Sequence, residues 1–582
     1  MSLDNSVDLP ETGDQPHTDV AAAANSVTER IGSVSDFEPG TMKMAKVGDR
    51  RVLVACTASG LHAIDNACPH QGYGLTTGAL DGDLVTCQWH NWKFDVTTGT
   101  CTRGEEDVAS HPLHVDDDGE VFVTITTPSN EAQRETLWPS LDRGIEAQYN
   151  GQIARDVARL LDAEATPDQI VWRALANRSA HTEWGVGHEM AGAADALAIS
   201  DIFDGLERTL PITHAVAGIA EVTRGRPARR VPEPAAGDFV EAVETERLDE
   251  AISALLQRHA DGATPSELKG ALIEAVSHHH LSYGHGLIYT QKACELLDRV
   301  GWHDAAALLP HLVTSIVWGT REDTLPYMSK AMKAIAEVDL EAMAATPDRR
   351  ATGWAGTDEL VETILEAQDA PTVIAAAVAA AHAGAGVEGV LDAVVLTVSR
   401  RMLRYDISNE TNSAEDFRWL DISHGLTYAR AARWAWREHP SAEAARLALF
   451  TAFLAFDTGR FERRTSVHTP DTATDPRVTD LADAILRRDP ATAVALAEAG
   501  DIESIGEQLR RGAFTDTAGS FIVAAHIVKM SQASAEEAVE IGSKLPLMAT
   551  ARLAASARQE RFVESAVTEA VEFIRTGAPP TR

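Results

Sequence analysis

The stretch CPHQGYGLTTGALDGDLVTCQWHNWKFDVTTG, residues 68–99, decides how the first part of the chain folds. It contains two Cys/His pairs, Cys68 with His70 and Cys87 with His90, and sixteen residues separate the pairs. Two thiolates can bind one iron and two imidazoles a second iron, as in an asymmetrically ligated [2Fe-2S] cluster. The same four side chains also suit a tetrahedral Zn²⁺ site, so ligand identity alone leaves both alternatives open.

The sequence around these pairs predicts an antiparallel β unit. Short β-branched runs alternate with turn residues from Asp49 to Thr127, as in RRVLVA, GLHAID, DLVTCQ, KFDVTTG and EVFVTITT. Asp-Gly and Gly-Asp pairs at 81–83 and 118–119 favour tight hairpins, because these residues tolerate positive φ angles. The two Cys/His pairs should therefore lie on separate loops between strands.

Residues 68–99 resemble the Rieske ferredoxin and oxygenase families along nearly their whole length, including the Gly-rich segment between the pairs and the W-x-F-D-x-x-T-G run. The resemblance implies a [2Fe-2S] cluster held by Cys68, His70, Cys87 and His90, in preference to zinc. Cys56, Cys101 and Cys294 lie outside the motif and are predicted to be structural.

Two departures from the high-potential respiratory Rieske proteins concern the reduction potential. Tyr73 and Trp89 stand where those proteins have a disulfide, and Trp92 and Phe94 stand where they have hydroxyl donors. Because fewer hydrogen bonds then reach the cluster sulfurs, the potential is expected to be low. A low potential suits a donor to an oxygenase.

Composition limits the classes of partner. The net charge of −36 repels nucleic acid and anionic membrane surfaces, so neither is an expected partner. The N-terminal residues are acidic and polar and do not read as a secretory signal, which predicts a cytoplasmic protein. The Ala-rich stretch 372–399 is interrupted by His382, Glu388 and Asp392 and is predicted to form a pair of buried helices.

The length and the change in periodicity predict a multidomain α+β chain, with a small antiparallel β domain followed by a large all-α domain. After residue 134 the sequence has long Ala-, Leu- and Glu-rich segments with apolar spacings of three and four. The expected boundaries are a disordered acidic tail over 1–33, the Rieske domain over 34–126, a linker over 127–145 and the helical domain over 146–582. A homo-oligomer is compatible with the sequence.

A Rieske domain transfers one electron at a time, so a mononuclear iron in the helical domain is the expected acceptor. Ring-hydroxylating oxygenases have an acidic residue, a His and a second His five residues later. Here Asp421 and His424 begin that pattern but position 429 is Ala. The catalytic domain of that family is therefore not present in this form.

The helical part resembles the questin oxidase family, all-helical proteins that include non-haem iron oxygenases. Four segments carry the resemblance: HTEWGVGHEMAGAADAL, SHHHLSYGHGLIY, DISHGLTYARAA and AAHIVKMSQA. It implies an Fe(II) site with a carboxylated lysine. The implied ligands are His188, one of His278, His280 and His285 with His278 the first choice, then His424, His526 and Lys529.

The implied site is physically reasonable, but a structural role for each residue is a real alternative. Neutral imidazoles suit Fe(II), and a lysine carbamate supplies an anionic oxygen. A lone helical His is more often structural, and the following are assigned to that class: His181, His303, His311, His382 and His439. Aromatic residues near the four segments could line a pocket for a flat substrate or form core, namely Trp184, Tyr283, Tyr289, Trp318, Tyr327, Trp419, Tyr428 and Trp434. Tyr283 and Tyr428, within the metal segments, are the chosen catalytic candidates besides Lys529.

The sequence thus predicts an oxygenase that receives electrons from a reductase or ferredoxin and uses O₂ to oxidise a small organic substrate, aromatic or quinone-like. One rival is an oxygenase without a second metal, in which the helical His residues are structural. Another is an electron carrier in which a Rieske ferredoxin is fused to a helical docking module. Iron content separates the carrier from the iron oxygenase.

Overall fold

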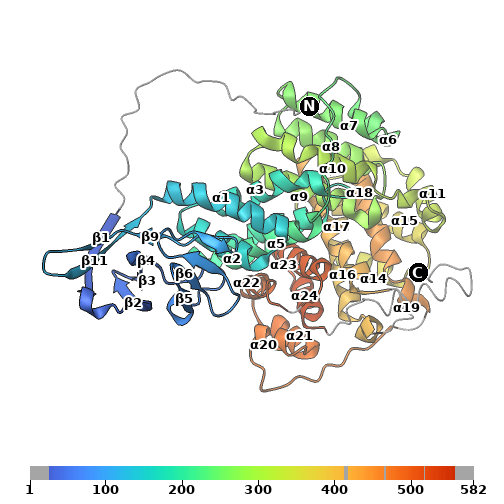
Figure 1. The fold of residues 1–582 in the computed structure, drawn as a ribbon. Coiled ribbons are helices and arrows are strands. Elements are labelled where there is room, and N and C mark those ends of the chain that lie inside the picture. Colours follow the sequence, from blue (N-terminus) through green and yellow to red (C-terminus); the bar gives the residue numbers. More distant parts are fainter. Residues whose placement is uncertain (1–24, 412–416, 465–466, 517, 557–582) are drawn as a thin grey trace, which may run out of the picture. The chain divides into compact units, whose positions relative to one another are not determined.

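The computed structural model describes residues 25–411, 417–464, 467–516 and 518–556. The chain divides into two compact units, residues 1–140 and 141–582. The first unit holds all the labelled strands and the second holds helices, as the colours along the chain in Figure 1 show. This confirms the predicted fold class, a small antiparallel β domain followed by a large all-α domain.

The β unit consists of three antiparallel sheets with the orders β1-β11-β10, β2-β3-β4-β9 and β5-β6-β7-β8. The strands are β1 Asn25–Ser33, β2 Thr41–Val47, β3 Arg50–Thr57, β4 Gly60–Asp65, β5 Ala79–Asp81, β6 Leu84–Thr86, β7 Lys93–Asp95, β8 Cys101–Arg103, β9 Ser110–His111, β10 Leu113–Val115 and β11 Glu120–Thr127. Most of them are joined to a sequence neighbour by a short connection, as the hairpin signals predict.

Strand β3 is buried on both faces and lies between two cores. Val52 and Val54 pack with residues of β11, whereas Leu53 and Ala55 pack on the other side with Cys68, Cys87 and other residues of the cluster loops. Successive side chains of a strand point to opposite faces, so one strand serves both cores. The second core supports the two thiols directly.

The predicted boundaries of the β domain need correction at both ends. Residues 25–33 were expected in a disordered tail, but they form β1 and pair with β11 from Asn25↔Thr127 to Ser33↔Glu120. The rest of that expected tail, 1–24, lies outside the described residues. The expected linker 127–145 is largely helix α1, Asn130–Ala147. Its Ala- and Glu-containing run favours helix, and the helix continues through Pro139 although proline has no N–H to donate.

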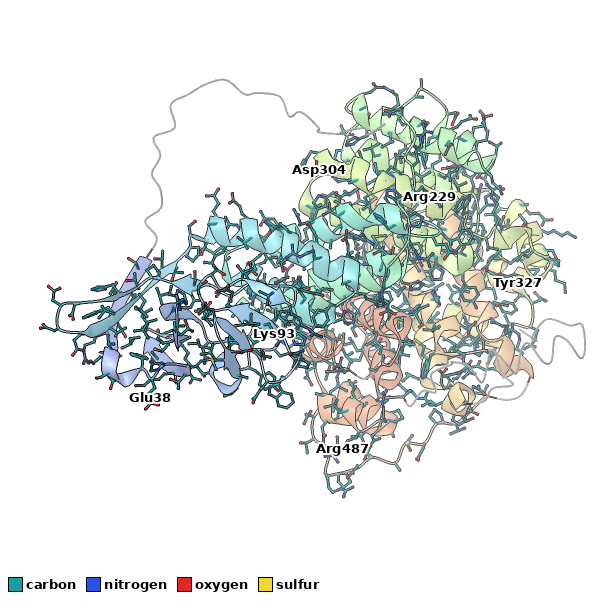
Figure 2. The ribbon with its side chains drawn as sticks, in the orientation of Figure 1. Glu38, Lys93, Arg229, Asp304, Tyr327 and Arg487 are labelled. Carbon is teal, nitrogen blue, oxygen red and sulfur yellow. The ribbon has the colours of Figure 1, made fainter. Side chains whose placement is uncertain are left out.

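The helical unit runs from the end of α1 to α24. Its first helices are α2 Asn150–Asp162, α3 Pro167–Arg178, α4 His188–Ile199, α5 Thr209–Thr223, α6 Phe239–Glu244, α7 Leu248–Ala260, α8 Pro265–Ser277, α9 His285–Val300, α10 Leu309–Val317, α11 Ser329–Ala336, α12 Leu340–Ala344, α13 Arg349–Thr352 and α14 Thr357–Glu366. Those that follow are α15 Ala370–Ala380, α16 Gly386–Leu403, α17 Trp419–Glu438, α18 Ala442–Asp457, α19 Arg460–Arg464, α20 Leu481–Leu486, α21 Pro490–Ala499, α22 Ile502–Gly512, α23 Phe521–Ile541 and α24 Leu545–Ala555. Side chains such as Asp304 and Arg487 are exposed on this unit (Figure 2).

Four of these helices form a closed ring of neighbours: α4 packs on α9, α9 on α17, α17 on α23, and α23 on α4. Each of the four begins close to one predicted ligand. His188 and His285 are the first residues of α4 and α9, and His424 and His526 lie in the second turns of α17 and α23. The ring therefore brings together segments that are far apart in the sequence.

The Ala-rich stretch forms α15 and α16, joined by a short π-helical segment, Ala381–Ala385. By length and composition alone, Ala370–Leu403 could cross a membrane. In this structure 61% of its most apolar window is buried inside the protein. The predicted pair of helices is present: α16 is mostly buried, whereas α15 is buried on one face only.

Candidate metal centres

The two Cys/His pairs lie on two loops of the β domain, one between β4 and β5 and the other between β6 and β7. The loops have the same backbone hydrogen bond: Cys68 N–H donates to Tyr73 O and Cys87 N–H donates to Trp92 O, each at 2.8 Å. Both thiols are 2% exposed, and the Nδ1 atoms of His70 and His90 are 2.9 Å apart. The loops thus present a buried thiol pair and a more exposed imidazole pair.

This arrangement fits a two-iron cluster better than a single zinc ion. A tetrahedral site would gather all four ligand atoms around one point. Among the residues that the structure describes, these four side chains do not form such a group. Burial and the adjacent Cys87 raise the pKa of the Cys68 thiol to about 11, so the thiolate needs a metal to stabilise it. Thiols paired on one side and imidazoles on the other suit the two irons of a [2Fe-2S] cluster.

Aromatic rings pack around the loops at the positions noted in the sequence. Tyr73 and Trp89 stack on each other with ring centroids 4.8 Å apart. The ring of Trp92 stacks on His70 at 5.0 Å and also lies near Phe94. A noncovalent aromatic stack therefore joins the two loops where the respiratory proteins were expected to have a disulfide.

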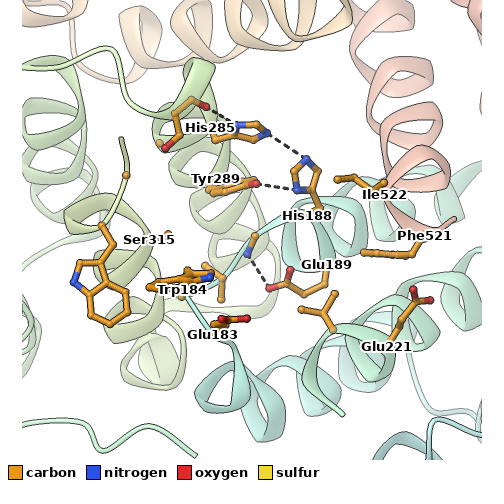
Figure 3. A pocket seen from close by; sticks show the side chains of 18 of the residues that line it. Glu183, Trp184, His188, Glu189, Glu221, His285, Tyr289, Ser315, Phe521 and Ile522 are labelled. Atoms are coloured by element: carbon orange, nitrogen blue, oxygen red, sulfur yellow. Dashed lines mark hydrogen bonds between the residues drawn. The ribbon is translucent and has the colours of Figure 1, made fainter. Parts of the chain in front are cut away.

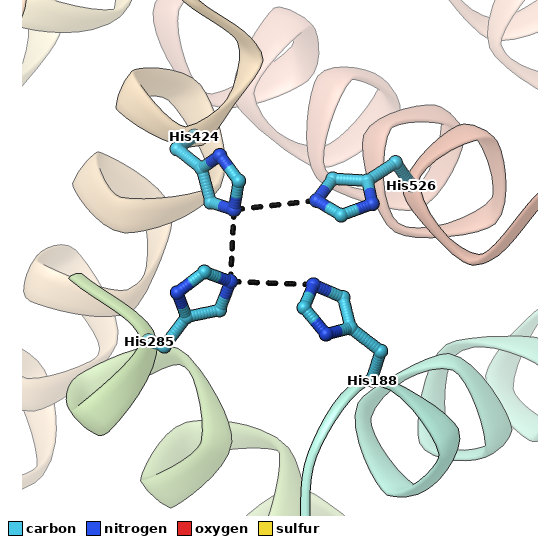
Figure 4. Close-up of side chains that lie close together, drawn as sticks. All are labelled: His188, His285, His424 and His526. Atoms are coloured by element: carbon cyan, nitrogen blue, oxygen red, sulfur yellow. Dashed lines mark hydrogen bonds between the residues drawn. The ribbon is translucent and has the colours of Figure 1, made fainter. Parts of the chain in front are cut away.

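The second site is in the helical unit, where four imidazoles converge (Figure 4). Nε2 of His285 is 3.2 Å from Nε2 of His188 and 2.9 Å from Nε2 of His424, and His424 Nε2 is 3.2 Å from His526 Nε2. Ligand atoms of all four lie within 4.8 Å of one another. Two nitrogens bound at ~2.1 Å to one ion would be ~3 Å apart for perpendicular bonds. We call these four residues the histidine group.

Hydrogen bonds at the outer ring nitrogens fix the tautomer and the orientation of three of these imidazoles. Nδ1–H of His285 donates to Ser282 O at 2.5 Å, that of His526 donates to Ile522 O at 2.6 Å, and that of His424 donates to Leu420 O. A carbonyl oxygen only accepts, so in these three rings Nε2 carries the lone pair. His188 Nδ1 lies 3.0 Å from the Tyr289 hydroxyl. Such outer hydrogen bonds orient imidazoles that bind metals.

The electrostatics keep the histidine group neutral. Burial lowers the pKa of His285 to about 3. Burial first, and the charges of Lys529 and the neighbouring imidazoles next, hold the pKa values of His188, His424 and His526 well below the usual value. Four neutral nitrogen donors facing one another suit a cation such as Fe(II), Zn(II) or Cu(II).

Lys529 lies one turn beyond His526 on α23 and is 2% exposed. Its Nζ has no hydrogen-bond partner in the described part of the chain. Burial lowers its pKa to about 7, although Asp195 acts in the opposite direction. A buried, unpartnered and partly neutral amine close to the histidine group is unusual for a structural lysine.

The family model for the Rieske [2Fe-2S] domain matches residues 28–113. The chain is 30% identical to "Ferredoxin CarAc" of Metapseudomonas resinovorans over 101 residues, which is 17% of this chain and 94% of the ferredoxin. The chain belongs to the Rieske [2Fe-2S] family. Residues Cys68, His70, Cys87 and His90 are the members of its β domain that would hold the cluster.

Other relatives align with the Rieske domain over shorter parts of their own length. The oxygenase component of 3-ketosteroid-9-alpha-monooxygenase from Rhodococcus rhodochrous is 38% identical over 66 residues, 11% of this chain and 18% of that protein. The chain thus spans less than a fifth of that relative. Among solved structures, the complex of reduced oxygenase and oxidized ferredoxin in carbazole 1,9a-dioxygenase is 28% identical, covering 17% of this chain and 94% of that one, with a TM-score of 0.16.

A cavity of about 640 Å³ in the helical domain reaches two members of the histidine group, His188 and His285 (Figure 3). Three of the aromatic residues singled out in the sequence line it, namely Trp184, Tyr289 and Trp318. Trp419, Tyr428 and Trp434 are instead buried in the core. The candidate substrate space therefore lies beside the second site.

Of the three histidines considered in the second segment, the structure brings His285 into the histidine group, and not the first choice, His278. His278 caps the end of α8, and His280 is fully buried with Nδ1 3.4 Å from the Tyr428 hydroxyl. Neither joins the histidine group. The five histidines assigned to structural roles are also outside it.

The two candidate catalytic tyrosines do not line the cavity. The Tyr283 hydroxyl accepts a hydrogen bond from Arg460 at 3.0 Å, and its ring meets His424 edge-on at 5.8 Å. Tyr428 is 1% exposed and packs on Gly284. Tyr283 thus contacts a ligand candidate, whereas Tyr428 has the surroundings of a core residue.

Glu189 and Phe521 are among the cavity residues that sequence reasoning did not single out. Glu189 directly follows His188, and its buried carboxylate accepts a hydrogen bond from Gly187 N–H at 2.8 Å. Phe521 begins the helix that carries His526. Proximity to the His-bearing segments was the available signal, but burial and the direction of a side chain are not visible in sequence.

Proposed function

We propose that this chain is a Rieske-containing non-haem iron oxygenase. Its cluster takes electrons from a reductase or ferredoxin and passes them to a mononuclear iron at His188, His285, His424 and His526. The observation that carries the proposal is the convergence of four neutral imidazoles, three of them with Nε2 lone pairs fixed by backbone carbonyls. A bound iron would supply O₂ activation for oxidation of a small organic substrate, aromatic or quinone-like.

Lys529 completes the proposed site as a carbamate. Its neutral amine would add to CO₂, forming the N–C bond and releasing one proton, and the product would present an anionic oxygen to the cation. The burial of Nζ, its lack of a hydrogen-bond partner and its lowered pKa support this proposal. Without the carbamate, the histidine group would hold the metal through neutral donors alone.

The chain's own residues have three tasks in this scheme. Carbonyls of Ser282, Leu420 and Ile522 hold the imidazoles in one tautomer and orientation. The ring of helices α4, α9, α17 and α23 buries His424 and His526, and it leaves His188 and His285 partly exposed to the cavity. The cavity beside His188 and His285 admits the organic substrate.

The second candidate is an electron carrier in which the helical domain is a docking module with no metal. The alignment with Ferredoxin CarAc over 94% of that protein favours it, because a ferredoxin-like domain alone can serve as a carrier. For both candidate functions we propose a cytoplasmic location and no nucleic-acid or membrane partner. The net charge of −36 supports it.

Metal content of paired variants tests the choice between them. We expect His285→Ala to lose the mononuclear iron while keeping the visible spectrum of the Rieske cluster, because the two sites take their ligands from different domains. His278→Ala, in the same segment but outside the histidine group, is the matched control and should keep all iron. Equal iron in His285→Ala, His278→Ala and the unchanged protein would favour the carrier.

A further inference from the structure

The cavity beside the histidine group has one end at the candidate metal site and the other at the surface. Figure 3 shows His188, His285 and Tyr289 toward one end of the lining, and Glu183 and Trp184 toward the other. Trp184 is 64% exposed and Trp318 is 44% exposed. Exposed tryptophans are uncommon on a protein surface and often mark a binding site.

The surface end is held in place by backbone and ring contacts. The segment 183–187 runs against α10, where Val186 N–H donates to His311 O at 3.1 Å. At Gly185, a Cβ would lie 2.3 Å from the same carbonyl, so only glycine allows this approach. The rings of Trp184 and Trp318 meet edge-to-face at 5.4 Å. These two packed rings form an aromatic rim at the surface end of the cavity.

The inner walls are also aromatic and apolar. The Phe521 ring lies directly over Gly218 of α5, where an added Cβ would be 2.2 Å from the ring. Tyr289 stands across from it, next to His188. Val222 and Ile522 add aliphatic surface. Aromatic side chains offer large flat contact areas to a planar ligand.

The charges in the lining offer nothing to hold an acidic group. Arg226 is the one arginine among the residues that line the cavity, and its guanidinium already pairs with Glu183 at 2.7 Å. The other acidic side chains there are the exposed Glu221 and the buried Glu189, and burial raises the pKa of Glu189 to about 7. Because Arg226 and Glu183 offset each other, an anionic ligand would meet the negative charge of Glu221 in the cavity.

We propose that this cavity binds a flat aromatic molecule without an acidic group, entering past the packed rings of Trp184 and Trp318 and placing its leading edge at His188 and His285. This site rests on the proposed function in one respect: oxidation of the ligand requires the metal. Binding of the ligand does not, because the aromatic walls are built from residues outside the histidine group.

Three naphthalene-sized probes test the ligand class on the full chain, both as purified and after chelation of its metals. We expect 2-naphthol to bind and to change the tryptophan fluorescence. The non-aromatic 2-decalol and the anionic 2-naphthoate should each bind about ten-fold more weakly. If 2-decalol bound as tightly as 2-naphthol, the preference for an aromatic ligand would be wrong. If 2-naphthoate bound as tightly, the exclusion of acidic ligands would be wrong. If 2-naphthol did not bind at all, the cavity would not be the proposed site.

A glycine pair locates the binding within the fold. Gly218→Ala should displace the Phe521 ring into the cavity and raise the Kd for 2-naphthol by about five-fold or more. Gly512→Ala is the matched control, because a Cβ there meets nothing within 4 Å, and it should leave the Kd unchanged. Equal Kd values for both variants would place the probe elsewhere. If the iron proposal fails, naphthol still binds the chelated protein, so the two failures are distinguishable.

Discussion

The chemistry of the candidate metal site in the helical unit depends on which atoms individual side chains direct toward its centre. Three imidazoles turn Nε2 inward because their Nδ1–H groups are bound to carbonyls. Lys529 adds an amine that burial makes partly neutral, with a pKa of about 7. A site lined by these uncharged nitrogen ligands can accept a cation together with one anionic ligand. The lysine is therefore the residue whose replacement is most informative.

Replacing Lys529 with Ala should lower the iron content from about three to about two per chain while the Rieske spectrum stays intact. Lys529→Arg should fail in the same way, because guanidinium stays protonated and forms no carbamate. Iron analysis with visible spectroscopy measures both. Lys544→Ala is the control, since Lys544 Nζ donates to a surface carbonyl, that of Glu498. Full iron in Lys529→Ala would make Lys529 an ordinary buried lysine.

At the Rieske cluster, Phe94 is fully buried in the core that holds Cys68 and Cys87. Phe94→Tyr would place a hydroxyl donor near the sulfurs and should raise the reduction potential by roughly 40 mV, the equivalent of one hydrogen bond of about 1 kcal/mol. Voltammetry measures the shift. Phe122→Tyr, on β11 beside His114, should leave the potential unchanged. An unshifted potential in Phe94→Tyr would contradict the argument by which we expect a low potential.

Residue by residue, the sequence predicted much of the site. His188, His424 and His526 lie in segments that contain few other histidines, and all three are in the histidine group. The segment SHHHLSYGH offered several histidines, and spacing could not choose among them. The choice depends on a turn: Tyr283 and Gly284 have φ angles of 60° and 93°, which place His285 at the start of α9. Left-handed backbone at a tyrosine is not predictable from its residue type.

At the scale of helices, a buried ion network locks α16, α17 and α23 together. Arg433 of α17 pairs with Glu388 and Asp392 of α16 at 2.5 and 2.9 Å, and with Glu537 of α23 at 2.9 Å. Helices α17 and α23 carry His424 and His526. The network thus fixes the relative position of two ligand helices.

Arg433→Met should lower the free energy of unfolding by about 3–5 kcal/mol, because it leaves the buried carboxylate of Glu537 without its partner and removes one of the arginines that pair with Glu388 and Asp392. Thermal or urea unfolding measures the change. Arg477→Met is the control: the Arg477 side chain is 83% exposed and pairs with Asp475 at the surface, so its loss should cost less than about 1 kcal/mol. Equal effects in the two variants would show that the buried network contributes no more than a surface pair.

The sequence predicted the type of each element better than its limits. Alternation identified the strands, and spacings of three and four identified the helices. Strand β1 was missed because its residues, NSVTERIGS, are mostly polar on an exposed edge that pairs only with β11. Helix α1 was taken for a linker because it has little amphipathic character.

For the whole molecule, the division into two units follows from composition, but the convergence of the histidine group does not. Its neighbouring members are 97, 139 and 102 residues apart in the sequence. Only the ring of α4, α9, α17 and α23 brings them together, and helix packing over such separations is not read from periodicity. The proposed oxygenase activity therefore requires that the ring hold a metal in addition to the two irons of the Rieske cluster.

The ratio of iron to acid-labile sulfide in anaerobically purified protein tests this claim most directly. The [2Fe-2S] cluster contributes two irons and two sulfides per chain, and a mononuclear iron adds one iron without sulfide. We expect about three irons to two sulfides. A ratio of one, with no other metal in the histidine group, would contradict the oxygenase and leave the electron carrier as the function of this chain.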